Sequence, residues 1–206
     1  MPAVDARAND AATIGSWHGV RIEIAPRDAV SVSVAVACAG VFSRETGREI
    51  GRAGPVGGLG NLNAALGGAI VRLRADGIFR AESCEVLTLS APAPPIQAST
   101  VLAIGLGDPD AWTPAIMRSA VAAAVRETLR IDAASAAFAP SLLDSGLDPD
   151  RLAGTPEAML AGLFDALPRD RPQPEALARW VFCVGAVHFD AMVLTFRAAY
   201  DRLVAG

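Results

Sequence analysis

The sequence predicts an α/β protein in which a mixed, mostly parallel sheet is flanked by helices. Apolar runs typical of strands alternate along the chain with stretches whose apolar residues recur every three or four positions, as on one face of a helix. Residues 100–105 form a continuous apolar run, typical of a strand buried on both faces. Thr113-Pro114 and Thr155-Pro156 each precede a periodic apolar stretch, and this pair is a common helix start.

The elements follow one another without a repeat or a clear internal linker, so residues 17–206 are expected to form one domain. The polar residues 1–16 are expected to be a flexible leader, and 43–58 and 169–174 to be loops. Asn61 is predicted to cap a helix that Gly77 ends. We expect strands at 18–25, 29–37, 83–89, 100–105, 134–140 and 179–187, and helices at 61–74, 114–130, 155–167 and 189–205.

Composition excludes several functions. All 18 basic residues are Arg, so chemistry that needs a lysine is absent, and the net charge of −4 argues against non-specific binding to nucleic acids. The uncharged windows 53–71 and 86–107 are broken by Gly and Pro, so no membrane span is expected, and no secretory signal precedes them. These features predict a cytoplasmic protein.

The remaining polar candidates are weak. Three cysteines, Cys38, Cys84 and Cys183, lie in apolar contexts and predict buried free thiols. His188 and Asp190 are too few for a metal site, which needs three or four converging ligands. The arginines 118, 126 and 130 share one helix face, which is the ordinary solvated face of such a helix. We expect no catalytic group, no metal and no cofactor.

Two glycine-rich segments are candidate ligand sites. Residues 54–61 carry Gly57, Gly58, Gly60 and Asn61 ahead of a helix, where backbone N–H groups can approach a phosphate. A surface loop explains the same pattern, because the segment is neither a P-loop nor a GxGxxG after a strand. Gly105, Gly107 and Asp108 follow the apolar strand, at the edge where open α/β sheets bind ligands. These glycines can equally serve only to turn the chain.

Three stretches together resemble the N-terminal domain of the leucine aminopeptidase (cytosol aminopeptidase) family. They are Leu62–Ile70 with the following Gly77-Ile-Phe79 and Glu82–Leu87, then Val101–Gly107, and then Leu163-Phe-Asp165. The resemblance covers roughly residues 17–205. It implies a macro-domain-like three-layer sandwich, and in this family peptidase activity belongs to a separate C-terminal domain with two metal ions.

The chain ends at Gly206 without the Asn-Thr-Asp-Ala-Glu-Gly-Arg signature of that peptidase domain and without any lysine. The resemblance therefore implies a non-catalytic accessory or assembly domain, either homo-oligomeric, as family members form hexamers, or paired with an aminopeptidase-type partner. The alternative is a macro-like module that binds a nucleotide or ADP-ribose, although the Asn-Ala-Ala-Asn pattern of active macro domains is missing.

Overall fold

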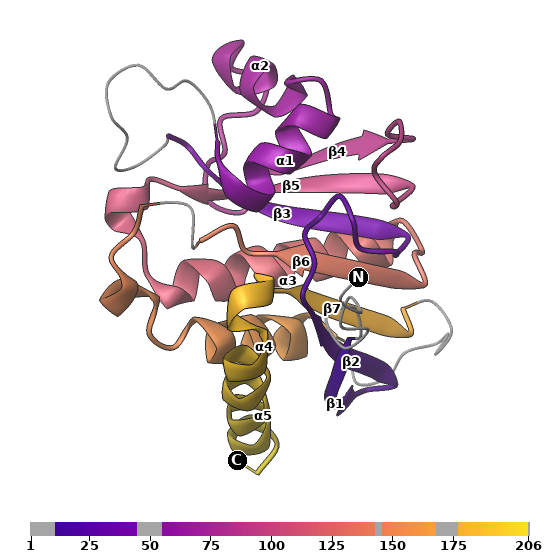
Figure 1. Ribbon diagram of the computed structural model, residues 1–206, viewed down its shortest axis with the longest axis vertical. Coiled ribbons are helices and arrows are strands. Elements are labelled where there is room, and N and C mark those ends of the chain that lie inside the picture. The colour runs from indigo at the N-terminus through magenta and orange to yellow at the C-terminus, as the bar shows by residue number, and fades with distance from the viewer. Residues whose placement is uncertain (1–10, 45–54, 143–145, 168–176, 206) are drawn as a thin grey trace, which may run out of the picture.

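A seven-stranded mixed sheet organises the computed structural model, which describes residues 11–44, 55–142, 146–167 and 177–205. The strand order is β1-β2-β7-β6-β3-β5-β4 (Figure 1). The five inner strands run parallel, and the two edge strands, β1 and β4, run antiparallel to their neighbours. The predicted α/β class with a mixed, mostly parallel sheet is therefore confirmed. The strands are β1 (Ala12–Trp17), β2 (Val20–Ala25), β3 (Val36–Phe42), β4 (Val86–Ser90), β5 (Thr100–Gly107), β6 (Ser135–Ala139) and β7 (Arg179–Cys183).

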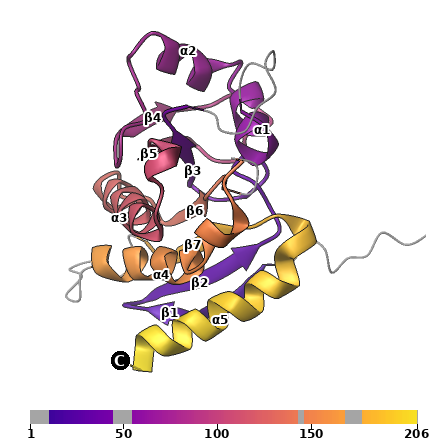
Figure 2. The ribbon, with the colours of Figure 1, turned by 90° about the vertical axis from the view of Figure 1, so that its left-hand side faces the viewer.

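Helices cover both faces of the sheet. In Figure 2, α3 and α4 lie on one side and α1 on the other. One hydrophobic cluster joins the sheet to α3, α4 and α5, and a second joins it to α1 and α2. Successive residues of a strand point to opposite faces, so Cys38 packs into the first cluster and Ala39 into the second. The helices are α1 (Gly57–Ala65), α2 (Ala69–Ala75), α3 (Pro114–Arg130), α4 (Thr155–Ala166) and α5 (Phe189–Ala205).

Strand β5 has the burial that its sequence predicts. Its residues Val101 to Leu106 are buried, as a strand covered on both faces should be. Helix α3 begins after Thr113 with Pro114 at its first position, as predicted, and α5 spans the predicted 189–205. Gly77 follows the end of α2 with φ +70°, which is the left-handed conformation that the sequence predicts there.

The predicted leader is wrong for residues 12–16, because they belong to the edge strand β1. Tyr200 of α5 fixes this strand: its hydroxyl donates to the carbonyl of Ser16 at 2.7 Å and accepts from the Ser16 N–H at 3.2 Å. Gly15 leaves room for the ring, since a Cβ there would lie 2.3 Å from Tyr200 Cζ. Residues 1–10, the rest of that prediction, lie outside the described residues.

The strand predicted at 29–37 is displaced to Val36–Phe42. Asp28 makes a turn instead, because its Oδ1 accepts hydrogen bonds from the N–H groups of Val30 and Ser31. Val32 and Val34 still bury their side chains, which explains the alternating pattern without a strand. The loop predicted at 169–174 and most of the one at 43–58 lie outside the described residues.

The single helix predicted at 61–74 is two helices. Gly67 and Gly68 adopt φ values of +62° and +81°, a conformation that ends α1 before α2 begins. Asn61 does not cap a helix, because it lies inside α1, which starts after Val56 without a side-chain cap. The Asn61 amide instead donates to Asp28 Oδ2 at 3.1 Å.

Candidate functional site

A cavity of about 470 Å³ opens at the carboxyl ends of β2, β6 and β7. The sheet accounts for its position, because parallel strands end at one edge and the segments that follow them form a crevice there. Its walls also include the first turns of α1 and α4 and the inner side of α5. The lining residues used below are Asp28, Gly57, Gly58, Asn61, Thr155, Met159, Cys183, Ala186, Met192 and Phe196.

Asp28 is a charged group of the cavity wall, which Arg27 also lines, and α1 and the turn after β2 hold Asp28 in place together. Its Oδ1 accepts from the Ser31 hydroxyl at 2.7 Å and from two backbone N–H groups, and its Oδ2 accepts from Asn61. Partial burial alone would raise the Asp28 pKa, but the hydrogen bonds from Ser31, Asn61 and Val30 outweigh it and lower the pKa. Asp28 is therefore an ionised acceptor on the cavity wall.

The opposite wall is mainly apolar and carries one orphaned polar group. Met159 of α4 and Met192 and Phe196 of α5 supply apolar surface. Thr155, at the first turn of α4, lines the cavity and is only 6% exposed, and its buried Oγ1 has no hydrogen-bond partner. Buried polar atoms without partners are rare, so this hydroxyl requires an explanation.

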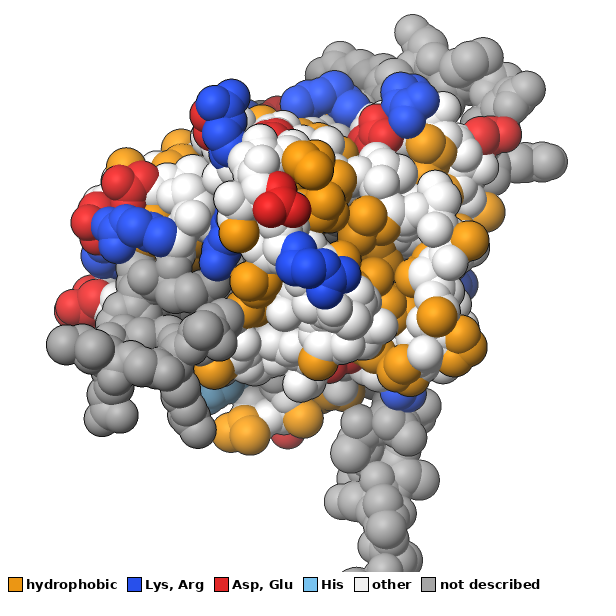
Figure 3. Space-filling model, turned by 90° about the horizontal axis from the view of Figure 1, so that it is seen from above, with side chains coloured by type: hydrophobic (Ala, Val, Ile, Leu, Met, Phe, Trp, Pro, Cys, Tyr) orange, Lys and Arg blue, Asp and Glu red, His pale blue; other side chains and the backbone are white. Residues whose placement is uncertain are grey.

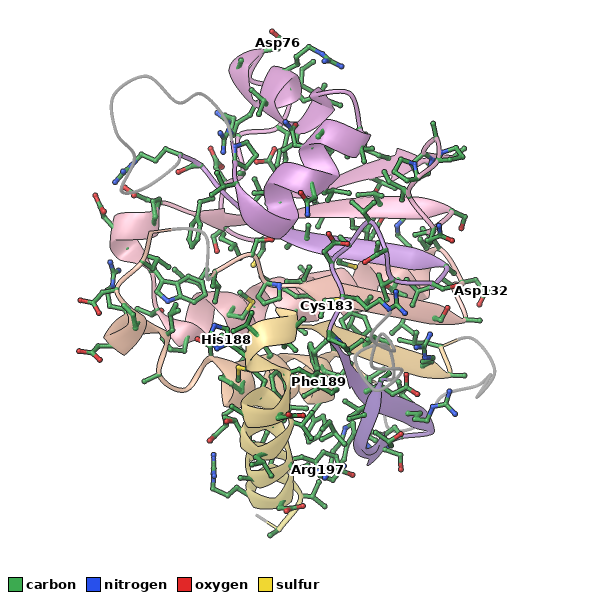
Figure 4. All side chains as sticks on the ribbon, viewed as in Figure 1. Asp76, Asp132, Cys183, His188, Phe189 and Arg197 are labelled. Atoms are coloured by element: carbon green, nitrogen blue, oxygen red, sulfur yellow. The ribbon has the colours of Figure 1, made fainter. Side chains whose placement is uncertain are left out.

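The Cys183 thiol is buried at the end of β7, where the cavity begins. Burial raises the pKa of this thiol to about 12, which leaves it protonated and unreactive. In Figure 4, Cys183 and His188 lie near the start of α5, whereas Asp132 lies at the other end of the strands. Cys38 and Cys183 are buried free thiols as predicted, while Cys84 is half-buried.

The two predicted glycine segments are not brought together. Gly57, Gly58 and Asn61 line the cavity, but Gly60, Gly105, Gly107 and Asp108 do not. A Cβ on Gly105 would lie 1.9 Å from the carbonyl oxygen of Glu82, so this glycine permits a close backbone contact. Asp108 caps the following turn by accepting from the Asp110 N–H, and it pairs with Arg44 at 3.0 Å.

Two of the other charged candidates, Arg118 and Arg130, are paired within the protein. Arg118 pairs with Asp165 at 2.6 Å, which raises the Arg118 pKa, and Arg130 pairs with Glu127. In the described parts of the chain, no three His, Cys, Asp or Glu side chains converge to hold a metal ion. Within the same parts, no helix is long and apolar enough to cross a membrane.

Sequence comparison decides the family. The model of the N-terminal domain of the cytosol aminopeptidase family matches residues 40–167, more than half of the chain. This chain belongs to the cytosol aminopeptidase family. The matching family model describes the N-terminal domain of the family. A search of curated protein sequences finds no match to the chain.

Solved structures support the macro-domain-like fold. A tomato leucine aminopeptidase mutant matches with a TM-score of 0.66 at 16% identity. The match covers 88% of this chain but only 35% of the tomato chain. An Oceanobacillus iheyensis macrodomain mutant with ADP-ribose matches with a TM-score of 0.65 at 12% identity, covering 96% of this chain and 99% of its own. A Trypanosoma brucei macrodomain in complex with ADP gives 0.60 at 16% identity, covering 87% of this chain and 68% of its own. These likenesses establish the predicted macro-like fold.

Asp28, Thr155 and the α5 wall were not identified as site residues from sequence. For Asp28 the sequence offers one usable signal, because Pro26-Arg-Asp28 is a turn that directly follows a predicted strand. The role of Thr155 depends on what surrounds its hydroxyl, which a sequence pattern does not contain.

Proposed function

We propose that this family member is a binding domain without peptidase activity of its own, and that its cavity takes a nucleotide-like ligand. The single observation that carries the proposal is the cavity of about 470 Å³ at the carboxyl ends of β2, β6 and β7. Small-molecule sites in proteins are mostly apolar cavities of this size with a few fixed polar groups. Two macrodomains of similar fold were solved with ADP or ADP-ribose.

The arrangement of the walls suits such a ligand. Met192, which is half-buried, offers an apolar surface for a flat base, and Asp28 Oδ2 can accept from a ligand N–H group in addition to Asn61. Gly57 and Gly58 open the first turn of α1, where backbone N–H groups and the helix dipole favour an anion. The chain's cytoplasmic location belongs to the same proposal.

Calorimetry with ADP-ribose, ADP, AMP and adenosine tests this function. At least one of them should bind more tightly than about 1 mM. Ala186→Trp places a large ring in the cavity wall and should abolish binding. Val187→Trp is the matched control, because Val187 is 92% exposed on the same short 3₁₀ helix (Ala186–His188) and does not line the cavity. No heat with any of the four ligands would refute the proposal.

Peptidase activity is tested separately. Purified protein with added Zn²⁺ or Mn²⁺ should not hydrolyse an aminoacyl p-nitroanilide. A member of the family that carries the peptidase domain is the positive control. Hydrolysis that survives purification and scales with the protein concentration would overturn this part of the proposal.

A second candidate function is assembly with further copies of the chain or with an aminopeptidase-type partner. Exposed hydrophobic side chains favour it: Leu194 and Val204 on α5 are 68% and 48% exposed. On the face seen from the α2 end, hydrophobic side chains form a band bordered by charged ones (Figure 3). Light scattering should then report a mass above 21.2 kDa, and Leu194→Asp should lower it. A monomer that co-purifies with no partner would contradict this function.

A further inference from the structure

We propose that Thr155 is a specificity-determining residue of the cavity: its hydroxyl, at the N-terminus of α4, holds an anionic phosphate oxygen of the ligand. The inference rests on the proposed nucleotide site and narrows it from nucleosides to their phosphates. It begins from an unsatisfied atom. Thr155 Oγ1 is buried without a partner, and the residue lines the cavity.

The backbone around Thr155 favours a negative charge. Gly154 precedes α4 with φ +79° and offers no side-chain cap. The N–H of Ala158 already donates to the Gly154 carbonyl, whereas those of Thr155 and Glu157 donate to no acceptor among the described residues. Two free N–H groups and a hydroxyl thus lie at the positive end of a 12-residue helix.

The one acidic side chain of this turn is engaged elsewhere. The Glu157 carboxylate pairs with Arg202 of α5 at 2.8 Å, which offsets its charge. The carboxylate of Asp28, which lines the cavity, accepts hydrogen bonds from Ser31 and from Asn61 of α1. The first turn of α4 therefore offers donors to an anion, and its own carboxylate is already paired.

Side-chain rotation gives the ligand access to the hydroxyl. Oγ1 is covered, so the small exposed part of Thr155 belongs to its other atoms. Threonine in a helix populates two χ1 rotamers, and a change between them moves the hydroxyl to a new direction at little cost. A ligand that offers a phosphate oxygen can select the rotamer that faces the cavity.

The stability of the ligand-free protein gives the first test. Thr155→Val keeps the shape and removes the unsatisfied hydroxyl, so its Tm should rise above that of the wild type. Thr155→Ser is the matched control, because it keeps the hydroxyl. A lower Tm for Thr155→Val would mean that the hydroxyl stabilises the fold, and it would overturn the proposal.

Binding gives the second test. Adenosine, AMP, ADP and inorganic pyrophosphate are titrated into the wild type and both variants. Thr155→Val should weaken ADP and AMP about tenfold, a typical loss for one hydrogen bond to a charged group, and leave adenosine unchanged. Thr155→Ser should bind within about twofold of the wild type. Equal effects on adenosine and ADP, or no effect on either, would overturn the role of Thr155.

The two proposals fail in different ways. If pyrophosphate binds and is weakened by Thr155→Val while adenosine and ADP-ribose compete poorly, the anion site stands and the nucleotide function falls. If adenosine and ADP-ribose bind but Thr155→Val changes neither affinity, the nucleotide function stands and the anion site falls. Absence of binding by all of these compounds, pyrophosphate included, removes both.

Discussion

Gly162 on α4 is a position where one added methyl group should strongly destabilise the protein. Helices α3 and α4 pack so closely there that a Cβ on Gly162 would lie 2.2 Å from the carbonyl oxygen of Arg118 and 3.1 Å from its Cα. Both atoms are backbone of α3, so no side chain can rotate away. Gly162→Ala must therefore push two helices apart, and both of them pack in the main hydrophobic core.

The magnitude follows from two opposing effects. Overpacking of a closely packed interior costs typically 1–3 kcal/mol, and a rigid backbone neighbour points to about 3 kcal/mol. Alanine recovers about 1 kcal/mol of the conformational cost of glycine in a helix. The net loss in the free energy of unfolding is about 2 kcal/mol, which for a protein of this size lowers Tm by roughly 4–8 °C.

Gly58→Ala is the matched control, because it makes the same change in helix α1. The nearest atom to a Cβ on Gly58 is Asp28 Cβ at 3.6 Å, an ordinary contact. Gly58→Ala should therefore raise the free energy of unfolding by about 0.5–1 kcal/mol. Thermal and urea unfolding of both variants measure the difference. A Gly162→Ala protein as stable as the wild type would refute the close packing of α3 against α4.

Three further predictions concern the fixed strand, the turn and the thiols. Tyr200→Phe removes the hydrogen bonds to Ser16 and should lower the free energy of unfolding by about 1 kcal/mol. Relative to the wild type, amide hydrogen exchange should accelerate more in β1 than in β5. The folded state lowers the Asp28 pKa below 3.8, so the ionised carboxylate contributes fully to the free energy of unfolding above pH 3.8, and this contribution is lost as the pH falls through the folded pKa. Asp28→Asn should therefore make the free energy of unfolding depend less on pH in this acidic range. An unchanged pH profile would refute this. At pH 8 a thiol reagent should modify Cys84 rapidly and Cys38 and Cys183 only on unfolding, since burial raises the pKa of both; rapid reaction of two or more thiols in the native protein would contradict their burial.

The sequence predicts those elements whose signals are local. Thr113-Pro114 marks the start of α3, and the apolar run of β5 predicts a strand buried on both faces. It fails where distant residues decide. Residues 12–16 look like a polar leader, yet Tyr200, 184 positions further on, binds Ser16 and makes them a strand. No window of sequence around Gly15 contains that contact.

The candidate site was also predictable only in part. The sequence predicts a ligand site at each glycine segment, but in the described parts of the chain the structure leaves a cavity at only one part of the carboxyl edge of the sheet. At the end of β5, the protein's own atoms take the available positions: the Glu82 carbonyl lies against Gly105, and Arg44 pairs with Asp108. At the ends of β2, β6 and β7, the strands leave a cavity, and there Asp28 is satisfied while Thr155 is not.

This asymmetry separates structural polar groups from those available to a ligand. Buried donors and acceptors are nearly always paired within the fold. The hydrogen bond between Asn61 and Asp28 has a structural role, because it joins α1 to the turn after β2. Thr155 has no such role in the described protein, and valine would fill its place at lower cost to stability. A hydroxyl without a partner in the free protein is explained if a bound ligand uses it. Comparing the stability and the binding of Thr155→Val is therefore the sharpest way to establish whether this family member binds an anionic ligand.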